Sequence, residues 1–388
     1  MVYFEAATLP ITYYDLDAFV KNVSMLATHL LDLCKLIFWA FNHRKLFEML
    51  NKLDDLTFIH GEYLVDPQIS PEVYQEDFLP KKILAEEKKI SDFALKSFFF
   101  FVFGVSCSAA LVSVYTLLFD YKENYYFIVD EHNVTIQQYD QLLPYSSKIP
   151  FNYNSGRPAF FCAILYQFYA LSYYAWNVIA LDTLFSYMMS FVCAHIKIVQ
   201  GAFKTIRGRC MKQFKLIENP SLLNDGPEMQ HAMLAEFKKC AQHLQQIFIT
   251  TDSLEDMFTG MTFLQVGTSL GVFCTNLYLV SSIPFGTRLA AEIIYLIAVL
   301  NELMLYCYFG HRVTLKAETI PDALFEGDWL STSMPFKRNM LLTMTRMTRP
   351  VHFTVGKFST LTLSTFVSIC RGSYSFFTAL KASEQKTV

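Results

Sequence analysis

Six long apolar stretches alternate with charged segments along this chain. They cover residues 23–42, 94–119, 159–195, 257–283, 289–310 and 351–380. A helix needs about 20 mainly apolar residues to cross a lipid bilayer, so each stretch is long enough to span it. The pattern predicts an all-α, polytopic helical membrane protein with six spans visible in the sequence.

Composition strengthens this prediction and argues against several classes of protein. Charged residues make up 17% of the 388 residues and hydrophobic residues 53%, whereas soluble domains carry about 25% charged residues. The string from Gly267 to Gly271 matches G-x-S-x-G, but it lies inside an apolar stretch without the strand–turn–helix context of a nucleophile. The cysteines and histidines show no zinc-type spacing. We therefore expect no enzyme, no cofactor, no metal and no nucleic-acid partner.

Lysine and arginine residues concentrate in every second segment between the spans. Segments 43–93, 120–158, 196–256, 284–288, 311–357 and 381–388 carry 7, 3, 8, 1, 7 and 2 of them. Cytoplasmic loops are enriched in these residues, so the rich segments are predicted to be cytoplasmic and the C-terminus extracellular. The glycosylation sequons at Asn22 and Asn133 then fall on the outer side of the membrane.

This orientation divides the chain into five parts. Residues 1–22 are predicted to be an extracellular segment, 23–310 transmembrane helices with cytoplasmic helical extensions, 311–350 a cytoplasmic loop, 351–380 a C-terminal helix and 381–388 an extracellular tail. In the first span, Asp32 and Lys35 lie three residues apart on one helix face, and we expect them to pair.

The last span is unusually polar for a helix in lipid. Its hydroxyl groups include those of Ser359, Thr360, Thr362, Ser364, Thr365, Ser368, Ser373, Ser375 and Thr378. Such a helix is stable in a membrane only if these groups face protein or water. The residues alone leave two interpretations open: a helix that packs against its neighbours through hydrogen bonds, or a helix that lines an aqueous pore.

The same stretch resembles a known family. Gly356-Lys357-Phe358, Leu361-Thr362-Leu363, Phe366 and Ser373-Tyr374-Ser375-Phe376-Phe377 are similar to the C-terminal signature of insect odorant receptors. The LFEMLNKLDD run after the first span and the alternation of charged segments resemble the same family. A gustatory-type receptor channel would share the architecture but not the SYSFF run. A polytopic small-molecule transporter should show inverted repeats, which are not evident.

The resemblance implies a fold and a function. Family members have seven helices and form tetrameric, ligand-gated, non-selective cation channels, in which an odour-tuning subunit assembles with an odorant receptor co-receptor. It further implies a plasma-membrane protein of olfactory sensory neurons that binds a volatile small-molecule odorant and contacts membrane lipid. The first span here matches the family's second helix, so we expect the family's first helix to be missing from this chain.

Candidate site residues follow from the resemblance. The family's last helix lines the pore, which here points to Ser375, Thr378, Ala379 and Ser383. The odorant pocket lies between the outer halves of the earlier helices, and apolar and aromatic side chains suit a volatile ligand. The candidates are Met25, His29, Val112, Tyr115, Phe161, Leu165, Phe168, Tyr169 and Tyr295. For each of them, ordinary helix packing is the alternative interpretation.

Overall fold

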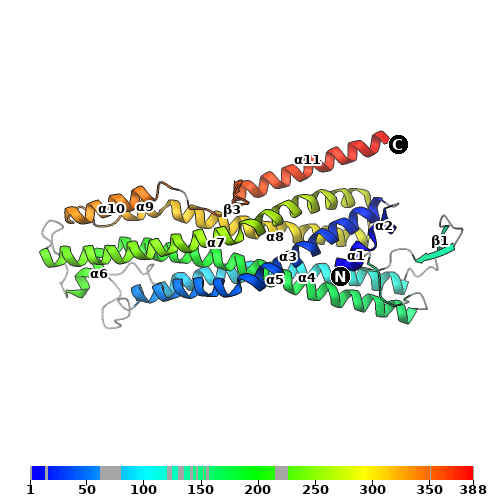
Figure 1. Cartoon of the computed structure of the whole chain (residues 1–388), viewed down its shortest axis with the longest axis horizontal. Coiled ribbons are helices and arrows are strands. Elements are labelled where there is room, and N and C mark those ends of the chain that lie inside the picture. Colours follow the sequence, from blue (N-terminus) through cyan, green and yellow to red (C-terminus); the bar gives the residue numbers. More distant parts are fainter. Residues whose placement is uncertain are drawn as a thin grey trace.

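Long helices packed side by side form an elongated bundle (Figure 1). A computed structural model describes residues 2–13, 16–61, 80–119, 125–129, 135–139, 143–145, 147–151, 153, 157–214, 226–349 and 351–387. The helices are α1 (Val2–Ala6), α2 (Leu9–Thr12), α3 (Leu16–Gly61), α4 (Pro80–Phe119), α5 (Arg157–Lys204), α6 (Ile206–Gln213), α7 (Pro227–Ser282), α8 (Thr287–Glu318), α9 (Ile320–Phe325), α10 (Met334–Arg346) and α11 (Leu363–Thr387). The strands are β1 (Tyr125–Val129), β2 (Thr135–Tyr139), β3 (Thr354–Val355) and β4 (Ser359–Thr360). The prediction of an all-α membrane fold is confirmed.

Five helices within the described part of the chain are long and apolar enough to cross a membrane. They contain Ala18–Lys52, Pro80–Phe119, Pro158–Lys204, Pro227–Ser282 and Thr287–Phe325. The first five predicted spans each lie in one of these helices, but the helices run further. Helix α7, for example, has 56 residues, which at 1.5 Å per residue is roughly 84 Å and more than twice the thickness of a bilayer core.

Helix α5 is the centre of the bundle. Within its most apolar window 67% of the residues are buried, compared with 17% in α4. Met188, Met189, Val192, Ile196 and Val199 are almost fully buried along it. Helices α3, α4, α7 and α8 all pack against α5, so a side chain on α5 can contact several helices that are distant in the sequence.

The last predicted span differs from the structure at its beginning. Residues 351–362, predicted to be helical, form a short β-hairpin instead, and α11 begins only at Leu363. Val351, Phe353 and Val355 are buried in alternation, which is the two-residue period of a strand. Gly356 and Lys357 form the turn with φ values of +58° and +66°, a conformation that helices do not use. Helix α11 is also not among the five most apolar helices, since polar side chains run along it.

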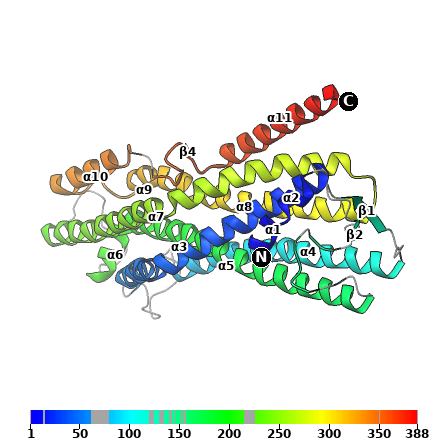
Figure 2. The same ribbon diagram turned by 45° about the vertical axis from the view of Figure 1, so that its right-hand side comes forward.

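The two ends of the bundle hold different loops. Helix α2, β1, β2 and the C-terminal end of α11 lie at one end, and α6, α9 and α10 lie at the other (Figures 1 and 2). We name the first of these the outer end. The segments that are poor in lysine and arginine gather there, as the charge pattern requires.

The N-terminal segment is joined to the first long helix. Helix α3 already begins at Leu16, so the end of the predicted extracellular segment, residues 1–22, belongs to this helix. Helix α1 packs against α3, and its Glu5 is fully buried.

Candidate ligand site and pore helix

A cluster of aromatic and polar side chains joins α3, α5 and α8 in the outer half of the bundle. His29 on α3 is 3% exposed, and its Nδ1 lies 2.7 Å from the carboxylate of Glu5 on α1. The edge of the His29 ring meets the Tyr174 ring, with the centroids 4.1 Å apart. Tyr145 borders the same histidine, with a centroid distance of 6.2 Å. The result is a largely buried site in which a carboxyl group contacts a histidine ring and two tyrosine rings border that histidine.

Thr28 is the point at which the three helices meet. The Tyr174 hydroxyl on α5 donates a hydrogen bond to the Thr28 carbonyl. The Tyr295 hydroxyl on α8 lies 3.4 Å from the Thr28 hydroxyl, which itself donates to the carbonyl of Met25 one turn earlier. We name Glu5, Thr28, His29, Tyr145, Tyr174 and Tyr295 the outer cluster. It contains the predicted pocket residues His29 and Tyr295, whereas Met25 contributes only its backbone carbonyl within α3.

The other predicted pocket residues do not converge on this cluster. Tyr115, Phe161, Leu165 and Tyr169 are 49%, 43%, 49% and 75% exposed, and Val112 and Phe168 are half-buried. On α5 the buried face instead carries Phe160, Ile164, Gln167 and Leu171. Both faces of this helix are apolar or aromatic, so the sequence pattern did not reveal which one turns inward.

A second group, at the middle of the membrane helices, is charged. The Lys35 ammonium lies 2.5 Å from Asp182 Oδ1 and 2.8 Å from Glu302 Oε1, and the Tyr306 hydroxyl donates to the same Asp182 oxygen over 2.7 Å. The predicted pairing of Lys35 with Asp32 is therefore wrong, because carboxylates on two other helices reach the ammonium group. We name Asp32, Lys35, Asp182, Glu302 and Tyr306 the charged cluster.

Helix α11 presents most of its predicted pore residues to the surface of the single chain. Ser375, Thr378 and Ala379 are exposed, whereas Ser373 is 1% exposed and its hydroxyl donates to the Leu270 carbonyl on α7 over 3.2 Å. Ser383 belongs to α11, but its side chain lies outside the described part. One face of the helix thus packs on α7, and a face that carries hydroxyl groups is left open.

Neither sequon gains support as a glycosylation site. Asn22 lies within α3 and is 2% exposed, and its amide donates to the Thr8 hydroxyl over 2.8 Å. A glycan would not fit at this buried position, which corrects the prediction for Asn22. Asn133 lies outside the described residues.

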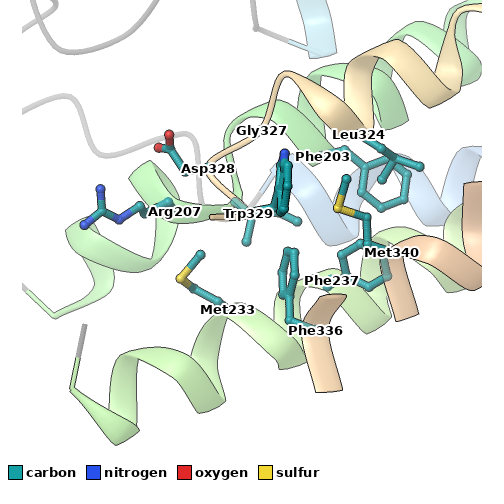
Figure 3. Close-up of a pocket in the computed structure, with 11 residues that line it drawn as sticks. Phe203, Arg207, Met233, Phe237, Leu324, Gly327, Asp328, Trp329, Phe336 and Met340 are labelled. Atoms are coloured by element: carbon teal, nitrogen blue, oxygen red, sulfur yellow. The ribbon is translucent and has the colours of Figure 1, made fainter. Parts of the chain in front are cut away.

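Two cavities lie away from the outer cluster. The first is between α5, α6, α7 and the α9–α10 segment, with Arg207 and Asp328 on one side and Trp329, Phe237 and Met340 on the other (Figure 3). Its volume of about 10 Å³ holds roughly one water molecule. The second, of about 260 Å³, is a half-open apolar groove between α4, α5 and α8.

Comparison with known proteins agrees with this architecture. A family model described as 7tm Odorant receptor matches residues 15–374. Odorant receptor 2a of Drosophila melanogaster is 28% identical over 148 residues, which is 37% of each chain. Odorant receptor Or2 of Anopheles gambiae is 26% identical over 152 residues, 38% of this chain and 39% of the relative. Odorant receptor Or1 of the same species is 20% identical over 258 residues, 64% of this chain and 62% of the relative. The matched part is thus less than two thirds of each relative's length.

Solved structures show the same fold. The olfactory receptor OR5 from Machilis hrabei in complex with eugenol superposes with a TM-score of 0.70 at 16% identity, covering 98% of this chain and 86% of that one. A structure of OR5 described without a ligand gives 0.69, also at 16% identity, with coverages of 98% and 85%. The predicted resemblance is confirmed, and with it the multi-pass membrane architecture. The match over residues 15–374 shows that the chain belongs to the odorant receptor family.

Proposed function

We propose that this chain is the odour-tuning subunit of a ligand-gated, non-selective cation channel that assembles with an odorant receptor co-receptor. It acts in the plasma membrane of olfactory sensory neurons, with the C-terminus outside the cell. The observation that carries this proposal is the open face of α11, where Ser375, Thr378 and Ala379 are exposed. Hydroxyl groups in the middle of a membrane require water or protein partners, and a shared pore between subunits supplies water.

The odorant binds at the outer cluster in this proposal. Its aromatic rings bury an apolar ligand, while the hydroxyl groups of Thr28, Tyr174 and Tyr295 orient it. Burial contributes about 25 cal/mol for each Å² of apolar surface removed from water. Ligand binding then shifts the population of the channel towards the open state, provided that the ligand fits the cluster better in that state.

Helix α7 connects the ligand site to the pore helix. Its Asn276 amide lies 3.4 Å from the Ser24 hydroxyl on α3, one turn from Thr28. Further along the same helix, Leu270 accepts the hydrogen bond from Ser373 of α11. A small displacement of α3 against α7 therefore reaches α11 through direct contacts.

Current recordings test the function. Cells that express this chain with the co-receptor should show cation currents evoked by volatile ligands, and cells that express either subunit alone should not show the same responses. Replacing Ala379 by the much larger Trp should reduce the evoked current at least about tenfold by narrowing the pore, since that residue is exposed on α11. Leu118→Trp, at a 66% exposed position on α4, is the matched control and should leave the current unchanged. Unchanged current and ion selectivity in Ala379→Trp would contradict the pore assignment.

A further inference from the structure

The buried charges next to the outer cluster do not balance. Glu5 pairs with His29, and Glu292 lies 2.8 Å from Lys21. In the charged cluster, however, a single ammonium group from Lys35 serves both Asp182 and Glu302. Asp32 adds a third carboxylate at 3% exposure. Two carboxyl groups thus share one ammonium group, and a third lies about one helical turn from it on α3.

Several acceptor oxygens in this region have no hydrogen-bond donor among the described residues. They are Asp32 Oδ1, Asp182 Oδ2 and Gln265 Oε1. All three side chains are at most 3% exposed. A buried acceptor without a partner destabilises the fold, and more so when it is charged. All three atoms are hydrogen-bond acceptors, so a group that satisfies them must donate hydrogen bonds, and the neighbouring carboxyl groups favour a donor with positive charge.

The charged cluster is continuous with the outer cluster. Asp32 follows His29 by three residues on α3, and Lys35 follows Asp32 by three. The three side chains therefore lie next to one another along one face of the helix. Tyr174 is half-buried, and its hydroxyl donates to the carbonyl of Thr28, which lies one turn of α3 before Asp32. A ligand that lies against the Tyr174 ring therefore has its apolar part in the outer cluster and its other end near Asp32.

From this arrangement we propose that the chain recognises protonated volatile amines, with the ammonium group bound by Asp32 beside the charged cluster and the apolar part held by the outer cluster. An ammonium group offers three N–H donors, which match the acceptors that lack a donor. The Tyr174 ring adds attraction for a cation placed over its face. A primary amine has a pKa of about 10 and carries its charge at neutral pH. The inference deepens the proposed function, because it names the class of ligand for the same site.

Binding to the purified full-length chain in lipid nanodiscs tests the inference. The probes are 2-phenylethylamine hydrochloride and 2-phenylethanol, which have similar shapes but differ in charge. The amine should raise the melting temperature of the chain and bind at least about tenfold more tightly than the alcohol, as expected for a charged hydrogen bond. Asp32→Asn should remove this preference, Asp32→Glu should keep it, and Asp252→Asn, at an exposed position on α7, should behave as the wild type.

Several outcomes would overturn the inference. Equal affinity of the wild-type chain for amine and alcohol would do so even if Asp32→Asn does not fold. A preference that survives in Asp32→Asn would also contradict it. If sodium or potassium chloride raises the melting temperature as much as the amine does, compared with N-methylglucamine chloride, the site takes an alkali ion instead.

Currents from the assembled channel separate this inference from the proposed function. Currents evoked by neutral odorants but not by amines would leave the function standing and overturn the amine site. Amine binding in nanodiscs without current from any odorant would support the site and contradict the channel function.

Discussion

At the residue scale, Lys35 on α3 holds together helices that are far apart in the sequence, because Asp182 on α5 and Glu302 on α8 both accept its hydrogen bonds. All three side chains are buried or nearly buried. A buried ion pair contributes little net stability, but removing one partner leaves the other charge uncompensated. Lys35 therefore stabilises the fold mainly by neutralising the buried carboxyl groups, while its attraction to them adds little net stability.

Replacing this lysine tests that argument. Lys35→Met should lower the free energy of unfolding by about 3–5 kcal/mol, because two buried carboxylates lose their cation. Adding Asp182→Asn to the same chain should restore part of the loss. The measurement is thermal unfolding of the chain in nanodiscs, with Lys96→Met at an exposed position on α4 as the control. Equal melting temperatures for Lys35→Met and the wild type would contradict the account.

Gly310 on α8 permits a close backbone approach by the segment that precedes α11. A Cβ atom at this position would lie 2.6 Å from the Leu361 carbonyl oxygen. Gly310→Ala should therefore destabilise the chain by about 1–3 kcal/mol, because the effect of overpacking outweighs the roughly 1 kcal/mol that alanine gains over glycine in a helix. Gly267→Ala, where no atom lies within 4 Å of the added Cβ, should be neutral or slightly stabilising. Chemical denaturation in detergent compares the two, and equal effects would refute the steric explanation.

The sequence identified only part of the candidate site at this scale. His29 and Tyr295 were predicted from their position on outer, apolar helices, and both belong to the outer cluster, His29 beside Tyr174 and Tyr295 beside Thr28. Tyr174, Thr28 and Glu5 were missed, because their roles depend on contacts between α1, α3 and α5 that no spacing within one helix encodes. The Lys35 pairing was wrong for the same reason: the nearer acid in the sequence is not the nearer acid in space.

At the element scale, the β3–β4 hairpin is the part that sequence patterns assigned wrongly. The apolar residues at the start of this segment and the polar helix after them were predicted to form one continuous span. The alternation of Val351, Phe353 and Val355 is a strand signal, however, and the glycine at 356 is a turn signal. The hairpin fixes where α11 begins, because the Leu361 amide donates to the Phe353 carbonyl over 2.8 Å. The ends of the other helices exceed their predicted spans, since helices continue into water where apolar composition stops.

Lys357 at the hairpin turn ties this element to α7. Its ammonium donates to Asp256 over 2.7 Å and to Glu255 over 2.5 Å, and these bonds raise the pKa of Lys357 above its ordinary value of 10.5. A raised lysine pKa means that the stabilising contribution is complete below the ordinary value and is lost as the pH rises through the raised one. The contacts of this lysine should therefore persist throughout the neutral range.

Hydrogen exchange tests the role of this lysine. Lys357→Ala should speed exchange of the Leu361 amide about threefold or more, since a less firmly held hairpin opens more often. In the wild type the protection should stay constant between about pH 6 and 9, after correction for the intrinsic exchange rate, because the lysine stays charged. Arg338→Ala, which removes an exposed cation on α10, is the control. Unchanged exchange in Lys357→Ala would show that the ion pairs do not hold the hairpin.

At the scale of the whole molecule, the charge pattern predicted which loops share an end of the bundle. Segments 120–158 and 284–288 and the C-terminal tail are poor in lysine and arginine. In the structure β1, β2 and the C-terminal end of α11 lie at the outer end, opposite α6, α9 and α10 (Figure 1). Loop charge can be read directly from the sequence, so the grouping of the loops at the two ends of the bundle could be predicted from it. The subunit interfaces of the proposed channel were not, because the partner surfaces would lie on other chains.

The most direct test of the account is the accessibility of α11 in the assembled channel. Cysteines would replace Thr378, which is exposed, and Ser373, which packs on α7. A positively charged methanethiosulfonate reagent added outside the cell should reduce the odour-evoked current of Thr378→Cys by at least about half, because positive charge placed in a pore opposes cation passage. It should leave Ser373→Cys unchanged. If the reagent changes the current of neither variant, although both are shown to reach the cell surface, a pore lined by α11 would be contradicted.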